Sequence, residues 1–174
     1  PEYPISDISR AETIVSERNA NSEFGCAGLV LDQIQDPRNF GAIIRSAAFF
    51  GLKFVIYGTD RQADITPLVV KTSSGGAFHL ELIPVTNINR AIKQLKEAGS
   101  WIVGTSLSEN TKDIRSLPKD RVWITVMGNE SKGLRQDVEK NCDFLVKITG
   151  GVQTIDSLNV SVATGVVLHA LSPL

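Results

Sequence analysis

Three short stretches of the sequence hold polar residues at spacings that could carry chemistry. The first is DQIQDPRNFGAIIR, from Asp32 to Arg45. Asn39, with Pro37 just before it, has the side chain of a helix N-cap residue. Gly41 and Arg45 are four residues apart, so they lie on one edge of a helix, and the missing side chain at Gly41 would leave room for a ligand backbone or sugar. Taken alone, an arginine on a helix flank is also a common solvated charge.

The second stretch, VMGNESKG at 126–133, is a hydrophobic strand pattern that leads into a turn with two glycines. The turn carries the carboxylate of Glu130 and the ammonium group of Lys132. A loop at the carboxyl end of a strand in an open α/β sheet is where ligands usually bind. Capping of a following helix is the alternative, since a carboxylate stabilises a helix N-terminus.

The third stretch, DSLNVSVA at 156–163, opens the last helical pattern of the chain. Ser157, Asn159 and Ser161 are polar, whereas the residues that follow are almost all apolar. Polar groups that become buried need hydrogen-bond partners. These side chains therefore either cap the helix or line a site for a polar ligand.

Alternating strand and helix patterns must position these three stretches. Strands are expected at 27–31, 54–57, 79–84, 101–103, 122–127 and 144–148, and helices at 39–50, 87–98, 135–141 and 157–171. This alternation indicates an α/β fold with a mostly parallel sheet and helices on both faces. The last helix is apolar around most of its circumference, which predicts that other structure encloses it.

The composition fits one globular domain, with 174 residues, 42% of them hydrophobic and 21% charged. We expect a linker or N-terminal tail over residues 1–24 and a single domain over 25–174. The net charge of −1 does not favour a stand-alone nucleic-acid binder. Two distant cysteines and scattered histidines indicate neither a disulfide framework nor a metal site, and no apolar run is long enough to cross a membrane.

Together the three stretches resemble the motifs of the SpoU (TrmH-like) branch of the SPOUT RNA 2′-O-ribose methyltransferases. The resemblance covers about residues 27–171 and is closest to the large-subunit rRNA guanosine 2′-O-methyltransferases of bacteria and mitochondria, including the stretch TPLVVKTSSGG at 66–76. The matching residues, in motif order, are Asn39, Gly41 and Arg45; Gly128, Glu130 and Gly133; and Ser157 to Ala163.

The resemblance implies a fold, a reaction and partners that the patterns alone do not show. The fold would be a SPOUT domain with a deep C-terminal trefoil knot, working as a homodimer. S-adenosyl-L-methionine would donate a methyl group to a ribose 2′-hydroxyl in RNA, with rRNA favoured over tRNA. No metal or membrane is implied, and the bacterial cytoplasm is favoured over the mitochondrial matrix.

The resemblance also implies roles for residues. Arg45 would act either as the base or as an electrostatic stabiliser of the developing alkoxide. Asn39 and Asn159 would orient it, and Glu130 or a phosphate oxygen would accept the proton. Main-chain groups would bind the cofactor at Thr105, Met127, Gly128, Ile148 and Leu158, and Arg38, Lys132 and Ser157 would contact RNA.

Two other functions compete with this one. A knotted module that binds RNA or cofactor without turnover would keep the fold, but all three motifs are intact. A nucleotide-dependent oxidoreductase would need a glycine-rich turn of the form Gly-x-Gly-x-x-Gly after the first strand, and the sequence has none there.

Overall fold

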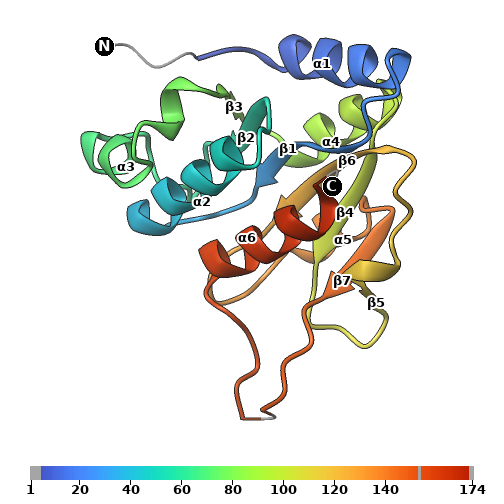
Figure 1. The fold of residues 1–174 in the computed structure, drawn as a ribbon. Coiled ribbons are helices and arrows are strands. Elements are labelled where there is room, and N and C mark those ends of the chain that lie inside the picture. Colours follow the sequence, from blue (N-terminus) through green and yellow to red (C-terminus); the bar gives the residue numbers. More distant parts are fainter. Residues whose placement is uncertain (1–4, 153, 173–174) are drawn as a thin grey trace.

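A parallel seven-stranded sheet forms the centre of the molecule. The computed structural model describes residues 5–152 and 154–172. The strand order across the sheet is β3-β2-β1-β6-β4-β7-β5, and every neighbouring pair of strands is parallel (Figure 1). The strands are β1 (Gly25–Leu31), β2 (Phe54–Gly58), β3 (Glu81–Val85), β4 (Trp101–Thr105), β5 (Lys112–Asp113), β6 (Val122–Met127) and β7 (Phe144–Lys147). The predicted α/β fold is confirmed, and β5 is a short edge strand that the sequence patterns did not indicate.

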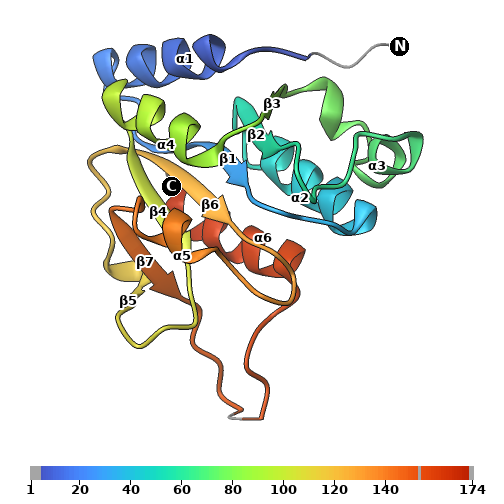
Figure 2. The ribbon, with the colours of Figure 1, turned by 180° about the vertical axis from the view of Figure 1, so that it is seen from behind.

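Helices cover both faces of this sheet. They are α1 (Ile8–Ala20), α2 (Pro37–Phe49), α3 (Pro67–Thr72), α4 (Ile88–Glu97), α5 (Gln136–Glu139) and α6 (Val160–Leu171), with 3-10 turns at Gly76–Phe78 and Ile114–Ser116. One hydrophobic cluster packs α2 and α6 against one face (Figure 1), and a second packs α1, α4 and α5 against the other (Figure 2).

Helix α1 differs from the expected linker or frayed tail. Ala11, Ile14 and Val15 are buried against the second cluster. The side chain of Asp7 caps the helix by accepting a hydrogen bond from the backbone N–H of Ser9. The other positions of α1 are mostly polar, so three buried residues anchor a helix whose apolar pattern is weak. The packed unit therefore includes residues that precede position 25.

Helix α6 is buried along one side only. Val167 and Leu168 are fully buried, whereas Val162 is 52% exposed and Val166 is 39% exposed. The expectation that other structure encloses this helix all round is therefore wrong within the described chain. The helix begins at Val160 instead of Ser157, and the trefoil knot stays a prediction.

The sheet brings the loops after β1 and β6 together. These strands are neighbours, and Leu31, the last residue of β1, is in register with Met127, the last residue of β6. In a parallel sheet the carboxyl ends of the strands share one edge. The turn at 32–36 and the loop at 128–134 therefore lie side by side, although they are almost 100 residues apart in sequence.

Candidate active site

The first motif lies where the turn after β1 enters α2. Asp36, not Asn39, is the N-cap residue: its side chain accepts a hydrogen bond from the backbone N–H of Arg38 at 2.7 Å. Pro37 occupies the first turn, where a missing N–H costs nothing. The predicted capping role of Asn39 is therefore wrong, and its side chain is free for contacts outside the helix.

Asn39 joins the three motifs. Its amide oxygen accepts a hydrogen bond from Nδ2 of Asn159 at 3.1 Å, and its Nδ2 donates to Oε1 of Glu130 at 3.5 Å. These partners are 120 and 91 residues away in the sequence. The chain therefore brings one polar residue from each motif to a single place.

Glu130 anchors the turn that precedes α2. Its half-buried carboxylate accepts hydrogen bonds from the backbone N–H groups of Gln35 at 3.1 Å and Asp36 at 3.0 Å, in addition to that from Asn39. Hydrogen bonds to a charged acceptor are stronger than neutral ones. The Glu130 side chain therefore connects the first motif to the second. Its role as proton acceptor stays a prediction.

The loop after β6 folds back on itself. Asn129 and Gly133 exchange backbone hydrogen bonds of 3.1 and 2.9 Å. A Cβ at Gly128 would lie 2.4 Å from the backbone of Gly133, so a larger residue would force this turn open. The side chain of Asn129 accepts from the N–H groups of Ser131 and Lys132. Asn129 is thus a structural residue of the site that the sequence patterns did not single out.

A pocket of about 410 Å³ lies beside this loop, at the carboxyl ends of β4, β6 and β7. The segment 156–158 and the start of α6 close its other side. All five residues predicted to bind the cofactor line it, and so do three other predicted site residues. These eight residues are Thr105, Met127, Gly128, Ile148, Leu158, Glu130, Lys132 and Ser157.

The pocket is apolar in one part and anionic in another. Buried Met127 and Val146 contribute apolar surface. Three carboxylates line it, from Glu130, Glu139 and Asp156, against the single ammonium group of Lys132. This balance suits a ligand that has a flat apolar part and carries positive charge.

Arg45 lies on the exposed side of α2, outside the residues that line this pocket. Within residues 5–152 and 154–172, its guanidinium group makes no hydrogen bond or ion pair. Arg38 is also exposed, in the first turn of the same helix. Both cations are therefore available to an anionic partner from solution.

The space beside Gly41 is filled by protein. A Cβ at this position would lie 2.6 Å from Cβ of Thr72 and 2.8 Å from the carbonyl oxygen of Val69, both in α3. The predicted room for a ligand at Gly41 is therefore wrong. The glycine instead allows α3 to pack closely on α2.

Two further observations concern metals and membranes. Among the described residues, no group of three or more His, Cys, Asp or Glu side chains is arranged to hold a metal ion. None of the helices that the structure describes has both the length and the apolar character needed to cross a membrane.

Comparison with known proteins gives consistent matches. Residues 27–169 match the model of the SpoU rRNA methylase family. A relative from Pseudomonas putida, named 23S rRNA (guanosine-2′-O-)-methyltransferase RlmB, is 41% identical over 140 residues, which cover 80% of this chain and 56% of that protein. A relative from Dictyostelium discoideum, named rRNA methyltransferase 1, mitochondrial, is 38% identical over 82% of this chain and 28% of its own length.

A solved structure supports the same grouping. The AdoMet-bound rRNA methyltransferase from Sinorhizobium meliloti superposes with a TM-score of 0.82 and 26% identity, covering 96% of this chain and 60% of that one. The chain thus spans little more than half the length of these bacterial proteins. Because the family model matches most of the sequence, the chain belongs to the SpoU rRNA methylase family.

Proposed function

We propose that the chain is the catalytic part of an enzyme that transfers a methyl group from S-adenosyl-L-methionine to a ribose 2′-hydroxyl in RNA. The observation that carries this proposal is the chain of hydrogen bonds from Glu130 through Asn39 to Asn159, next to the pocket. The favoured substrate is a guanosine of large-subunit rRNA, in line with the name of the Pseudomonas putida relative.

The pocket suits this cofactor. Its volume of 410 Å³ lies in the range of about 300–1,000 Å³ that is usual for small-molecule sites. Met127 and Val146 offer an apolar surface for the adenine ring, and main-chain groups near Thr105, Gly128 and Ile148 can pair with its polar edge. Glu139 and Asp156 complement positive charge. When bound, the cofactor supplies an electrophilic methyl group on a sulfonium.

The side chains around the pocket then orient the hydroxyl group. Asn39, held by Glu130 and Asn159, fixes the start of α2 and with it the helix that carries Arg45. Alignment of the hydroxyl oxygen with the methyl group is the main expected contribution, since positioning two reactants can supply about 7–11 kcal/mol.

We assign Arg45 an electrostatic role. A guanidinium group keeps its proton in proteins, and this one is exposed to water. It would hold the phosphate next to the target ribose and stabilise the negative charge that develops on the 2′-oxygen. The hydroxyl proton would pass to a phosphate oxygen, because the Glu130 carboxylate already accepts several hydrogen bonds.

The partners that we propose are RNA and a second copy of the chain. Arg38, Lys132 and Ser157 would contact RNA, since all three are exposed and Lys132 and Ser157 line the pocket. The exposed apolar residues Val162 and Val166 of α6 would form part of a homodimer interface. For the compartment we propose the bacterial cytoplasm, in keeping with the bacterial RlmB relatives, with the mitochondrial matrix as the alternative that the Dictyostelium name supports.

Two measurements test the function. Isothermal titration calorimetry with S-adenosyl-L-methionine, with NAD as the control ligand, should show binding of the first only. Transfer of a radiolabelled methyl group to large-subunit rRNA should then give an alkali-resistant dinucleotide. Binding without transfer to either rRNA or tRNA would favour a non-catalytic module, and transfer to tRNA alone would overturn the choice of rRNA.

A further inference from the structure

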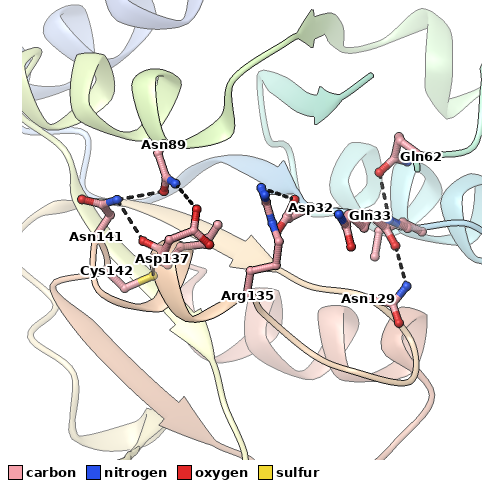
Figure 3. Close-up of polar contacts among 11 residues, drawn as sticks. Asp32, Gln33, Gln62, Asn89, Asn129, Arg135, Asp137, Asn141 and Cys142 are labelled. Atoms are coloured by element: carbon pink, nitrogen blue, oxygen red, sulfur yellow. Dashed lines mark hydrogen bonds and ion pairs between the residues drawn. The ribbon is translucent and has the colours of Figure 1, made fainter. Parts of the chain in front are cut away.

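A charge pair between the first residue of the first motif stretch, Asp32, and Arg135, which lies beyond the second stretch, links the turn after β1 to the loop after β6. The carboxylate of Asp32 accepts hydrogen bonds from Nε of Arg135 at 2.9 Å and from its terminal nitrogen at 3.0 Å (Figure 3). The Asp32 side chain is only 3% exposed, whereas that of Arg135 is 43% exposed. Burying a carboxylate costs free energy, and this cost is offset only while the two parallel hydrogen bonds from its partner are kept.

The two residues stand at the borders of functional segments. Asp32 directly follows β1, and its backbone N–H donates to the carbonyl oxygen of Met127 at 2.9 Å. Arg135 follows the 128–134 loop and is the N-cap residue of α5. The pair therefore ties the far end of the loop to the point where the turn begins.

The near end of the same loop is tied to the same turn. Nδ2 of Asn129 donates to the carbonyl oxygen of Gln33 at 2.9 Å, and Oε1 of Gln62 accepts from the N–H of Ile34 at 2.9 Å (Figure 3). Gln33 has φ of 62°, in the left-handed region that a residue other than glycine rarely adopts. These contacts hold an unfavourable backbone conformation in place from both sides.

We infer that Asp32 and Arg135 are positioning residues that fix the 128–134 loop against the cofactor and couple it to the turn leading to Asn39 and Arg45. Neither side chain lines the 410 Å³ pocket, so neither would touch the bound cofactor there. This inference rests on the proposed function. It adds to the proposed site two residues that act through the backbone of the 128–134 loop.

The physical reason is that the carboxylate of this ion pair is buried whereas its guanidinium partner is partly exposed. If Arg135 is removed, the carboxylate of Asp32 is left buried without its partner and must find water or a new donor. Both residues line a cavity of about 230 Å³, so water can reach the carboxylate, and the far end of the loop is then no longer tied to the turn. If the charge of Asp32 is removed, Arg135 is free to turn into solvent, and the loop keeps its ties through Asn129 and Glu130 but loses the one at its far end.

The experiment compares Asp32→Asn, Arg135→Gln and the double variant with the unaltered chain. Calorimetry should give a Kd for S-adenosyl-L-methionine that is about tenfold higher in each single variant, a change of about 1.4 kcal/mol in binding free energy. The double variant should lose less than the product of the two single effects. At saturating cofactor, the methyl-transfer rate of each single variant should lie closer to that of the unaltered chain than its Kd does.

A matched control is Asp143→Asn, which breaks the 3.1 Å bridge to Lys96, away from both loops. It should lower the unfolding temperature without changing cofactor affinity. Hydrogen exchange of the amides of 128–134 in the free protein provides a readout that needs no cofactor, and it should speed up in Arg135→Gln but not in the control. Arg135→Lys, which keeps the charge but loses the paired hydrogen bonds, should give an intermediate Kd.

The outcomes separate the two levels of the proposal. If the unaltered chain binds the cofactor and both single variants bind it equally well, with unchanged exchange of the loop amides, the positioning role is overturned while the function stands. If the unaltered chain does not bind S-adenosyl-L-methionine at all, both proposals fall together.

Discussion

At the scale of residues, Glu130 and Arg45 lie in opposite environments. The Glu130 carboxylate accepts hydrogen bonds from the turn after β1 and from the amide of Asn39. The Arg45 guanidinium is exposed, with no hydrogen bond or ion pair to the described part of the chain. A group already saturated by the protein holds structure in place, whereas a free group can bind a substrate.

Arg45→Ala should therefore reduce methyl transfer by at least about 10²-fold and leave cofactor affinity almost unchanged, because the residue would act on the substrate side in the transition state. Single-turnover transfer to rRNA and calorimetry with S-adenosyl-L-methionine would measure the two quantities. The control is Arg90→Ala, an exposed arginine on α4, which covers the other face of the sheet. Equal activity in Arg45→Ala and the unaltered chain would contradict the assignment.

Cys142 gives a prediction about pH. Burial, together with the nearby carboxylates of Asp143 and Glu139, raises the pKa of this thiol from its ordinary value of 9.0 to about 12. Between these values the unfolded chain loses the proton that the folded chain keeps, so the folded state binds more protons and its stability falls as pH rises.

The free energy of unfolding should accordingly decrease from about pH 9 upward, and more steeply in the unaltered chain than in Cys142→Ala. Urea unfolding at several pH values would show the difference in slope. Burial also raises the pKa of Cys26, so part of the slope should remain in the variant. Identical slopes in the two proteins would contradict the effect attributed to Cys142.

At the scale of elements, the close contact of α2 and α3 depends on Gly41. Alanine at this position would place a methyl group 2.6 Å from Cβ of Thr72, so α3 would have to move. We expect Gly41→Ala to destabilise the fold by about 1–3 kcal/mol, as overpacking usually does. Chemical denaturation would measure this loss.

Gly165→Ala on α6 is the matched control for that prediction. The nearest atom to a Cβ there is Oγ of Ser46 at 4.0 Å, so the methyl group has room. Alanine is the better helix former by about 0.5–1 kcal/mol, and this variant should be slightly more stable than the unaltered chain. If both substitutions changed the free energy of unfolding in the same direction, the packing argument for Gly41 would be wrong.

The elements with strong periodicity could be predicted, and those with weak patterns could not. The expected helix at 39–50 corresponds to α2, because its buried residues Phe40, Ile43, Ile44 and Ala47 follow the 3.6-residue period. In α1 only three residues are buried, and α3 has only six residues, one of them buried. Such short or mostly polar helices are set by tertiary packing, which no local pattern reveals.

The candidate site could likewise be predicted from the sequence only in part. The three motifs meet as expected through the hydrogen bonds of Asn39 to Glu130 and Asn159. Among the described residues, no hydrogen bond joins Asn39 or Asn159 to Arg45, which both were expected to orient. The pair of Asp32 and Arg135 was not expected, because its members are 103 residues apart and each resembles an ordinary surface charge in the sequence. The filled space at Gly41 was not expected either, since it depends on α3.

At the scale of the whole molecule, the exposed apolar side of α6 is the surface that we expect a second copy of the chain to cover. Val162 and Val166 are 52% and 39% exposed, on a helix whose other side is in the core. If a second copy covers this face, Val166→Glu should shift the chain from dimer to monomer, because a charge would be buried without a partner.

Light scattering coupled to size-exclusion chromatography would measure the mass in solution. Leu68→Glu, at a residue on α3 that is 47% exposed, is the control and should leave the mass unchanged. A monomeric unaltered chain, or a dimer that survives Val166→Glu, would contradict the proposed interface.

The pairing of β1 with β6 also has a consequence for how the protein is made. In a nascent chain, β1 leaves the ribosome long before β6, and contacts between segments so distant in sequence form slowly. Until Met127 has emerged, the edge of β1 that β6 will occupy is open to wrong pairing with other strands. Translation must then proceed to α6 before the wall of the pocket is complete. Incomplete translation products would therefore lack a complete pocket, and they would expose strand edges to chaperones or to aggregation.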